Sequence, residues 1–406
     1  MVSIVVPVVR TEKGKRCIRH AIKNAGISPA HIEIVTEYDT HRIGAPEMVK
    51  RLVGMTSHDL VMFLGDDTIP QPGYMRHALD AMQKLPGGWG LVGLNDQQRN
   101  GKTLATHWLA DKRMLNLLDG EFFCTDYRHC FCDRELTDIA IEHDRYIWAE
   151  DAKIEHDHPM FTHEESDIDY QRAYDKDTYI NDWKTYVSRK ITRYGFKLGI
   201  GLPVANRQQD KDFWLSFLMA DKPDYTILVP SVEVYNFPQD IAHVRNDLAN
   251  QALNEGCSHL LMMDTDQVYK PDTITKLLAH DVDVVGALVH RRYPPFSPIL
   301  YRGTLGNYEY VPDDEMFSGE LVEVDATGCG CILFNTGVFI DTDYPWFKIE
   351  KKDGKTVGED IGFCSRIRSK GYKVFVDTSA TVDHITTFRV NRSTYELFKR
   401  AARKGD

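Results

Sequence analysis

Short apolar runs alternate with amphipathic segments along the first part of the chain. The runs "VSIVVPVV", "HIEIVTE" and "DLVMFLG" are separated by helix-like segments near residues 14–25 and 46–56. This βαβαβ order predicts a mainly parallel sheet with helices on both faces. Such sheets bind ligands at the carboxyl ends of their strands.

The same order returns after residue 197. The runs "KLGIGLPVA", "YTILVPS" and "HLLMMDTDQVYKP" are separated by helix-like segments near residues 210–220 and 239–255. Superposing "FLGDDTIPQP" on "MMDTDQVYKP" places Asp67 on Asp266. Further along, a second Asp lies 23 residues before a His in the first copy and 24 before a His in the second. Because two independent spacings agree, we infer an internal duplication.

The segment between the copies, residues 160–196, is polar, acidic and aromatic. Its Tyr and Trp residues recur at roughly helical spacing, which predicts a helical connector packed against one domain. A charged, solvated linker is the alternative. The predicted organisation is an N-terminal domain, the connector, a C-terminal domain and a basic helix or tail, over residues 1–159, 160–196, 197–390 and 391–406.

Length and charge narrow the class of protein. A chain of 406 residues suits two cores of ordinary size. Its net charge of −11 gives no global field that favours nucleic acid or an anionic membrane. No apolar run approaches the length of a membrane span, and the order of apolar and charged residues at the N-terminus is wrong for a signal peptide. We therefore expect a cytoplasmic location, the host cytoplasm if the protein is viral.

The 8 Cys are scattered along the chain, which favours reduced thiols. Cys124, Cys130 and Cys132, with His129 nearby, could bind zinc. Their spacing is not a standard one, so ordinary buried thiols are the favoured interpretation.

The acidic residues that follow the apolar strands carry the candidate chemistry. Asp264 and Asp266 come directly after the run "HLLMM". A carboxylate is costly to bury unless a cation or a set of donors meets it. Another carboxylate and then a His follow about a hundred residues later. Oxygen ligands with one imidazole suit Mn²⁺ or Mg²⁺, and an open coordination position suits a diphosphate.

With these motifs, each half resembles a GT-A glycosyltransferase domain of the inverting family 2 type. The resemblance implies an α/β fold with two tandem GT-A domains, which are Rossmann-like nucleotide-diphospho-sugar transferase domains, joined by the helical connector. In that family the DxD motif holds a divalent cation and the donor diphosphate. A later Asp, often in an "ED" pair, is the general base, and a His completes the metal site.

The second half matches this pattern fully. The resemblance implies that Asp266 and His384 ligate the metal, and that Asp360, preceded by Glu359, takes the proton of the acceptor hydroxyl. Asp264 would contact the ribose or a metal-bound water. The resemblance also implies residues that contact the nucleotide. These are Pro203, Arg245 and Asp264 in the second half and Pro7, Asp39 and Asp66 in the first.

The first half departs from the pattern. Gly65 stands where the first Asp of the DxD motif is expected, although Asp67, the more direct ligand, remains. Asp133 takes the position of the base without a Glu before it. His156, with His158 beside it, supplies the third element of the metal site. These changes bear on the activity of the first half more than on its fold.

We therefore expect a metal-dependent, inverting glycosyltransferase that uses nucleotide sugars, UDP-sugars first, and that is bifunctional if both sites turn over. Nucleotidyl transfer is one alternative, but neither first strand is followed by a glycine-rich phosphate loop. A degenerate glycan-binding module is another. Locally, Asp66 and Asp67 could cap a turn, "GED" could cap a helix, and His384 could be structural.

The acceptor is predicted to be a glycan or another hydroxyl compound. A modified nucleic acid is the second choice, because compact tandem transferases of this style also occur in viruses, where a hydroxymethylated base in DNA can be the acceptor. The tail "RSTYELFKRAARKG" would supply a local basic helix for phosphates. A solvated terminal helix is the simpler account of that tail.

Overall fold

A computed structural model describes residues 1–97, 102–157, 168–204, 210–231, 240–352 and 354–387, and residues 392, 394 and 396. The chain divides into two compact units, Met1–Tyr186 and Val187–Asp406. We call these the first and second unit and describe each by itself. Within the described residues, no helix combines the length and the apolar composition that crossing a membrane requires.

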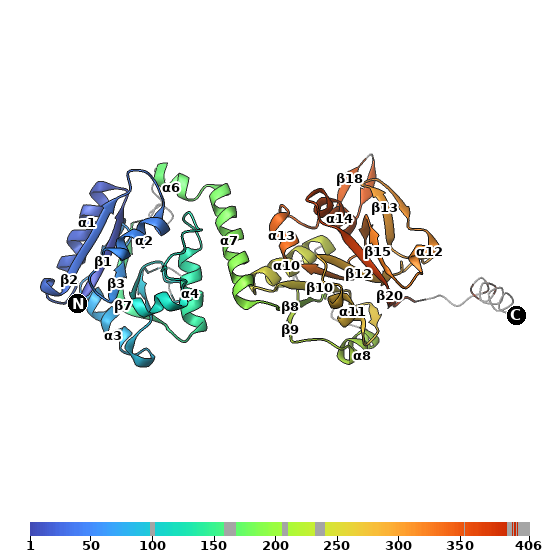
Figure 1. Cartoon of the computed structure of the whole chain (residues 1–406), viewed down its shortest axis with the longest axis horizontal. Coiled ribbons are helices and arrows are strands. Elements are labelled where there is room, and N and C mark those ends of the chain that lie inside the picture. Colours follow the sequence, from blue (N-terminus) through green and yellow to red (C-terminus); the bar gives the residue numbers. More distant parts are fainter. Residues whose placement is uncertain are drawn as a thin grey trace. The chain divides into compact units, whose positions relative to one another are not determined.

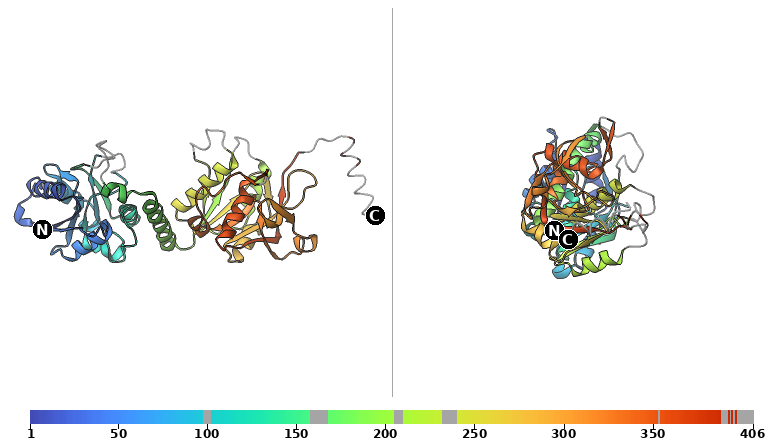
Figure 2. Two further views of the ribbon diagram at one scale, coloured as in Figure 1. Left: turned by 90° about the horizontal axis from the view of Figure 1, so that it is seen from above. Right: turned by 90° about the vertical axis from the view of Figure 1, so that its right-hand side faces the viewer.

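The first unit contains a seven-stranded mixed sheet with the order β2-β1-β3-β6-β5-β7-β4. Strands β1, β2 and β3 are parallel, β6 runs antiparallel to β3 and β5, and β4 runs antiparallel to β7. Figures 1 and 2 show the strands with helices packed along them. The strands are β1 (Val2–Val8), β2 (Ile32–Tyr38), β3 (Leu60–Phe63), β4 (Thr68–Pro70), β5 (Leu91–Asn95), β6 (Trp108–Asp111) and β7 (Tyr146–His156). The helices are α1 (Thr11–Lys23), α2 (Ala45–Gly54), α3 (Tyr74–Met82) and α4 (Cys132–Glu142), with short 3₁₀ turns at Pro29–His31, Pro86–Gly88 and Lys112–Leu117.

The core of the first unit lies between the sheet and the helices α1 and α3. Alternate residues of β1, among them Ile4 and Val6, point to this side, as the two-residue period of a strand requires. They pack with Ala21 of α1 and with Tyr74 and Ala78 of α3. This packing fixes β1 and β3, and therefore the loops that follow them at the carboxyl edge of the sheet.

The sheet of the second unit repeats this arrangement. Its order is β9-β8-β10-β17-β12-β20-β11, and each neighbouring pair runs in the same relative direction as its counterpart in the first unit. The strands are β8 (Leu198–Gly201), β9 (Tyr225–Leu228), β10 (His259–Met263), β11 (Gln267–Tyr269), β12 (Val284–Val289), β17 (Cys331–Asn335) and β20 (Val374–His384), with β15 (Leu321–Val324) added beside β20. The helices are α8 (Lys211–Met219), α10 (Ile241–Asn254), α11 (Thr273–Ala279), α12 (Asp313–Met316), α13 (Gly337–Asp341) and α14 (Glu359–Ser369). Two small sheets, β14-β13-β16 and β18-β19, consist of β13 (Leu300–Thr304), β14 (Asn307–Tyr310), β16 (Ala326–Thr327), β18 (Glu350–Lys352) and β19 (Lys355–Val357).

The α/β fold class predicted from the sequence is confirmed. The four helices expected in the two βαβαβ segments form within a few residues of their predicted ends, over 11–23, 45–54, 211–219 and 241–254. The boundaries 1–159 and 197–390 stay predictions, because the division into units falls inside α7.

Two helices form in the described part of the predicted connector, α6 (Ile168–Ala173) and α7 (Lys176–Tyr194). Tyr170 and Tyr186 are buried, and the ring of Phe131 contacts those of Tyr179 and Tyr186. These connector tyrosines thus pack against the start of α4, whereas the side chains of a solvated linker would not be packed in this way. Residues 160–167 of the connector and nearly all of the tail 391–406 lie outside the described residues.

Candidate functional site

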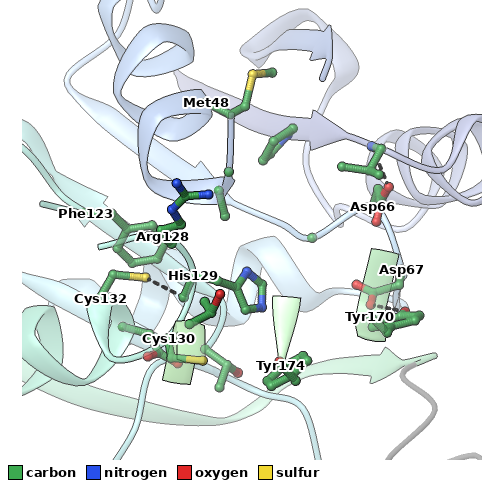
Figure 3. A pocket seen from close by; sticks show the side chains of 18 of the residues that line it. Met48, Asp66, Asp67, Phe123, Arg128, His129, Cys130, Cys132, Tyr170 and Tyr174 are labelled. Atoms are coloured by element: carbon green, nitrogen blue, oxygen red, sulfur yellow. Dashed lines mark hydrogen bonds between the residues drawn. The ribbon is translucent and has the colours of Figure 1, made fainter. Parts of the chain in front are cut away.

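A cavity of about 600 Å³ opens at the carboxyl edge of the first unit's sheet. All six site residues predicted for this half line it: Pro7, Asp39, Asp66, Asp67, Asp133 and His156. Aromatic side chains, including Phe123, Tyr170 and Tyr174, form much of its remaining wall. Figure 3 shows Asp67 and Tyr170 at one end of the cavity and Cys130 and Cys132 at the other. The volume is within the range of about 300–1,000 Å³ that is usual for small-molecule sites.

Asp66 anchors the loop between β1 and α1. Its Oδ2 accepts hydrogen bonds from the backbone N–H groups of Val9 (2.9 Å) and Arg10 (2.7 Å), and its Oδ1 accepts one from Arg10 Nε (3.0 Å). The carboxylate therefore lies at the N-terminus of α1, where the helix dipole favours a negative charge. These contacts give Asp66 a positioning role at this loop, and its contact with a nucleotide stays a prediction.

Asp67 is buried, with 5% of its surface exposed, and points into the cavity. Its Oδ2 accepts a hydrogen bond from the Tyr170 hydroxyl (2.6 Å) and lies 3.6 Å from His156 Nε2 and 3.3 Å from the Arg10 guanidinium. Burial on its own would raise the pKa of Asp67, but His156, Arg10 and Tyr170 lower it on balance. The carboxylate is therefore ionised at neutral pH, as a metal ligand must be.

His107, which the sequence motifs did not identify, completes a group of potential ligands. One donor atom from each of Asp67, His107 and His156 lies within 4.8 Å of the other two. Among the residues that the structure describes, no other group of three or more His, Cys, Asp or Glu meets this criterion. His107 precedes β6 in "ATHWLAD", a stretch with no recognisable metal motif. The one sequence feature that could have pointed to a different ligand is Gly65, which replaces the first Asp of the motif in "GDD".

Asp133 lies in the first turn of α4 and lines the cavity. Its Oδ1 accepts a hydrogen bond from the N–H of Arg134 (2.8 Å), and burial raises its pKa. A raised pKa suits a group that takes up a proton during a reaction.

The zinc interpretation of the neighbouring cysteines finds no support in the described residues. Cys132 is buried and its Sγ donates to the carbonyl of His129 (3.3 Å), whereas Cys124 and Cys130 are half-buried. None of these residues belongs to the one potential metal-binding group found there.

Asp39 follows β2 and uses both carboxylate oxygens to order the next loop. They accept hydrogen bonds from the N–H groups of Ile43 (2.9 Å) and Gly44 (3.2 Å). Asp39 and Pro7 line the cavity, so both are placed for contact with a nucleotide, and that contact stays a prediction.

In the second unit Asp266 and His384 also meet at the sheet edge. His384 Nε2 lies 3.4 Å from Asp266 Oδ2, and Arg292 contacts both side chains. Nδ1 of His384 lies 2.8 Å from the carbonyl oxygen of His290, which can only accept a hydrogen bond. Nδ1 therefore carries the proton, and the lone pair of Nε2 accepts a hydrogen bond from Arg292 Nε (3.3 Å) beside Asp266.

The register of the two sheets explains why both pairs form. In the first unit His156 is opposite Thr68, the residue after Asp67. In the second unit His384 is opposite Gln267, the residue after Asp266. The equivalence that sequence superposition predicted is thus reproduced by the hydrogen-bonded pairing of the strands.

Arg245, on α10, joins the two acidic motifs of the second unit. Its guanidinium contacts Glu359 and lies 3.3 Å from Asp264 Oδ1, and only 5% of the residue's surface is exposed. Burial on its own would lower the pKa of Arg245, but the surrounding negative charges, that of Asp264 first, raise it on balance. Contact of Arg245 with a nucleotide stays a prediction, because in the structure its guanidinium is engaged by two carboxylates.

Among the described residues of the first unit, this ion-pair network has no counterpart. Cys132 stands in the place of Glu359, directly before Asp133, and α2, the helix that follows β2, carries no Arg in its first turn. Both partners are absent together, as expected if each charge requires the other when buried.

Asp360 follows Glu359 in the first turn of α14. Its Oδ1 accepts a hydrogen bond from the N–H of Ile361 (2.7 Å). A Cβ atom at Gly358 would lie 2.9 Å from Asp360 Oδ1, and one at Gly328 would lie 3.5 Å from Oδ2. Gly358 thus leaves room for the carboxylate, and Gly328 lies beside its other oxygen.

Arg245→Met is expected to destabilise the second unit by about 3–5 kcal/mol, because it leaves the buried Glu359 and the half-buried Asp264 without their cation. Denaturant unfolding of the full chain measures the change. The matched control is Arg302→Met, which removes an arginine whose ion pair with Glu315 is exposed at the surface. We expect a change of at most about 1 kcal/mol there. Equal effects of the two substitutions would show that the buried network contributes little.

No family model matches the chain, and no curated protein matches it. Solved structures that match include A197 from STIV, at 16% identity over 48% of this chain and 97% of that chain, with a TM-score of 0.33. TarS from S. aureus in complex with UDP-GlcNAc matches at 16% identity over 49% of this chain and 61% of that chain, with a TM-score of 0.31. The mannosyltransferase PcManGT from Pyrobaculum calidifontis in complex with GDP-Man and Mn²⁺ matches at 13% identity over 48% of this chain and 64% of that chain, with a TM-score of 0.33. The chain thus spans less than two thirds of the last two structures. At these values we base function on the geometry of the sites.

Proposed function

We propose that each unit is a GT-A-type domain and that the chain transfers sugars from nucleotide-sugar donors to hydroxyl acceptors. One observation carries the proposal: both sheets bring a strand-end Asp and a His together at equivalent positions, Asp67 with His156 and Asp266 with His384. In each unit a further Asp lies in the first turn of the helix that precedes the His-bearing strand, Asp133 in α4 and Asp360 in α14. Asp133 lines the same cavity as Asp67 and His156.

The residues present fit a divalent cation such as Mn²⁺ or Mg²⁺. Each pair offers carboxylate oxygen and imidazole nitrogen. The protonated Nδ1 of His384 leaves the lone pair on Nε2, to which Arg292 donates in this structure and where a cation would take its place. Asp266 and His384 would hold the ion in the second unit, and Asp67 and His156 in the first. When bound, the cation neutralises the charge that develops on the diphosphate leaving group.

The protein side of the reaction in the second unit centres on Asp360. Its carboxylate accepts the proton of the acceptor hydroxyl while that oxygen forms a bond to the anomeric carbon of the donor sugar. The bond between this carbon and the diphosphate oxygen breaks on the opposite face, so the configuration inverts and a nucleoside diphosphate leaves. Arg245 holds Asp264 and Glu359 in place beside Asp360.

In the first unit Asp133 would play the corresponding part. Successive transfers by two active units, or one active unit beside one that holds an acceptor, are the two arrangements that this proposal allows. The acceptor is proposed to be a glycan or another hydroxyl compound. No observation in the described residues favours a nucleic acid, since the basic tail that would contact it lies almost entirely outside them.

The test is release of nucleoside diphosphate from UDP-, GDP-, CDP- and TDP-sugars by the full chain with Mn²⁺. We expect release from at least one donor, and loss of that release when the metal is chelated. A parallel melting experiment with Mn²⁺ and each nucleoside diphosphate reports binding, because a ligand at 100 times its Kd stabilises a protein by about 2.7 kcal/mol. Stabilisation without release would favour a binding module. The absence of both stabilisation and release would contradict the proposal.

A further inference from the structure

We infer that the first unit binds its cation through one carboxylate and two imidazoles, Asp67, His107 and His156, and selects Mn²⁺, Co²⁺ or Zn²⁺ over Mg²⁺ more strongly than the second unit does. The inference deepens the function proposed for the first unit and in that sense rests on it. Its test measures metal binding alone and needs neither a donor nor turnover.

The three donor atoms are close enough for one ion. Ligands about 2.0–2.2 Å from a common ion lie roughly 3–4 Å from one another. The separation of Asp67 Oδ2 and His156 Nε2, 3.6 Å, is already in this range, and all three separations are at most 4.8 Å. Asp67 and His107 are both buried, with 5% and 3% of their surfaces exposed. A contraction of about 1 Å therefore forms the centre.

A hydrogen-bond relay fixes the proton of His107 on the nitrogen that faces away from Asp67. The Thr106 hydroxyl donates its single proton to Asp96 Oδ2 (2.7 Å). Its oxygen lies 3.2 Å from His107 Nδ1, so Nδ1–H must be the donor in that contact. The Nε2 atom of His107 then carries the lone pair on the side of the cavity. Metal-binding histidines are oriented by such outer partners.

Gly65 makes room for this imidazole. A Cβ atom at position 65 would lie 3.1 Å from His107 Nε2 and 2.8 Å from Asp67 Oδ1. Any side chain there would push the two ligands apart. The glycine is therefore explained by the space that His107 occupies.

The second unit carries different residues at the positions equivalent to Gly65 and His107. Phe63 is opposite Trp108 in the first sheet, and Met262 is opposite Ile332 in the second. Continuing each register by one residue places His107 in correspondence with Cys331. The first unit thus combines Gly65 with His107, and the second combines Asp264 with Cys331. Where the second unit has a carboxylate after its central strand, the first unit has an imidazole from the neighbouring strand.

This exchange changes which metals bind well. Imidazole nitrogen suits later first-row ions, whereas carboxylate and water oxygens suit Mg²⁺. The first unit offers two imidazoles. The second offers His384 and Asp266, while its Asp264 is engaged by Arg245. The first site should therefore discriminate against Mg²⁺ more strongly.

The experiment uses the full chain carrying Asp266→Ala, which leaves the first site as the proposed metal site. Calorimetric titration with Mn²⁺, Co²⁺, Zn²⁺ and Mg²⁺ gives the affinities, and pulsed EPR of bound Mn²⁺ counts the imidazole ligands. We expect nitrogen couplings from two imidazoles and an affinity for Mn²⁺ at least tenfold above that for Mg²⁺. His107→Ala should reduce the couplings to one imidazole, and Thr106→Val should weaken binding by about 10–100-fold. The control is His31→Ala, which removes an exposed imidazole.

Unchanged Mn²⁺ affinity and unchanged couplings in His107→Ala would overturn the inference, as would equal affinities for Mn²⁺ and Mg²⁺. Should His107→Ala fail to fold, as judged by melting, Thr106→Val decides, because it keeps the imidazole and nearly the same volume. A chain that binds Mn²⁺ through two imidazoles but releases no nucleotide would refute the proposed function and leave this centre standing. A chain that turns over donors with only one imidazole on the metal would support the proposed function and refute this centre.

Discussion

Replacing Asp67 or Asp266 by Ala is expected to abolish nucleotide release from one donor each, by a factor on the order of 10³ or more. Each substitution removes the carboxylate that meets a His at a sheet edge, and with it several kcal/mol of charge stabilisation in the transition state. If both units turn over, the two variants lose different donors. The measurement is release of nucleoside diphosphate across the donor panel, with both variants and the unaltered chain in parallel.

Two further variants control for damage to the fold. Asp59 and Asp283 are exposed residues directly before β3 and β12, at the amino ends of those strands. Asp59→Ala and Asp283→Ala should leave release unchanged. Loss in Asp266→Ala alone would assign catalysis to the second unit and leave the first as a binding site. Full activity in both Asp67→Ala and Asp266→Ala would contradict the placement of the sites.

Asp360→Asn is expected to lower sugar transfer by the second unit by about 10²–10⁴-fold, the usual contribution of a general base. The amide has the shape of the carboxylate, and its oxygen can still accept the hydrogen bond from Ile361, but it cannot take up the acceptor proton. Binding of nucleoside diphosphate with Mn²⁺, measured as a shift in Tm, should be unchanged. The two measurements together separate loss of the base from loss of the donor site.

The control for this substitution is Asp240→Asn. Asp240 caps the start of α10, where its side chain accepts a hydrogen bond from the N–H of His243, and Asn caps helices about equally well. Transfer should therefore persist. If Asp360→Asn also retains full transfer while the chain stays folded, another group must take the proton.

Several features could be predicted from the sequence because they depend on local periodicity or on the duplication. Apolar runs and helix-like segments located β1, α1 and their counterparts, since the periods of strands and helices are properties of consecutive residues. The duplication provided the correspondence of Asp67 with Asp266 and of His156 with His384. Strand pairing then places each Asp beside its His, although the catalytic roles stay predictions.

Other contacts were decided only by tertiary packing. Tyr170 donates to Asp67 from 103 residues away, and Arg245 contacts Glu359 across 114 residues. Neither pair shares a motif or a period. Arg245 was expected at a nucleotide, and in the structure the buried Glu359 and the half-buried Asp264 engage its guanidinium. Such pairings follow from which helix covers which strand end, and local sequence does not specify this.

The sequence by itself therefore determined the α/β order, the repeat and the acidic residues at the strand ends. The tertiary structure decided which side chains meet those acids. His107 shows the difference most clearly, because it became a candidate ligand only when antiparallel pairing of β6 with β3 brought it beside Asp67. Its sequence neighbours carry no metal motif. The physical reason is that a metal site requires donor atoms a few ångströms apart in space, and strand register, which long-range packing sets, brings them together.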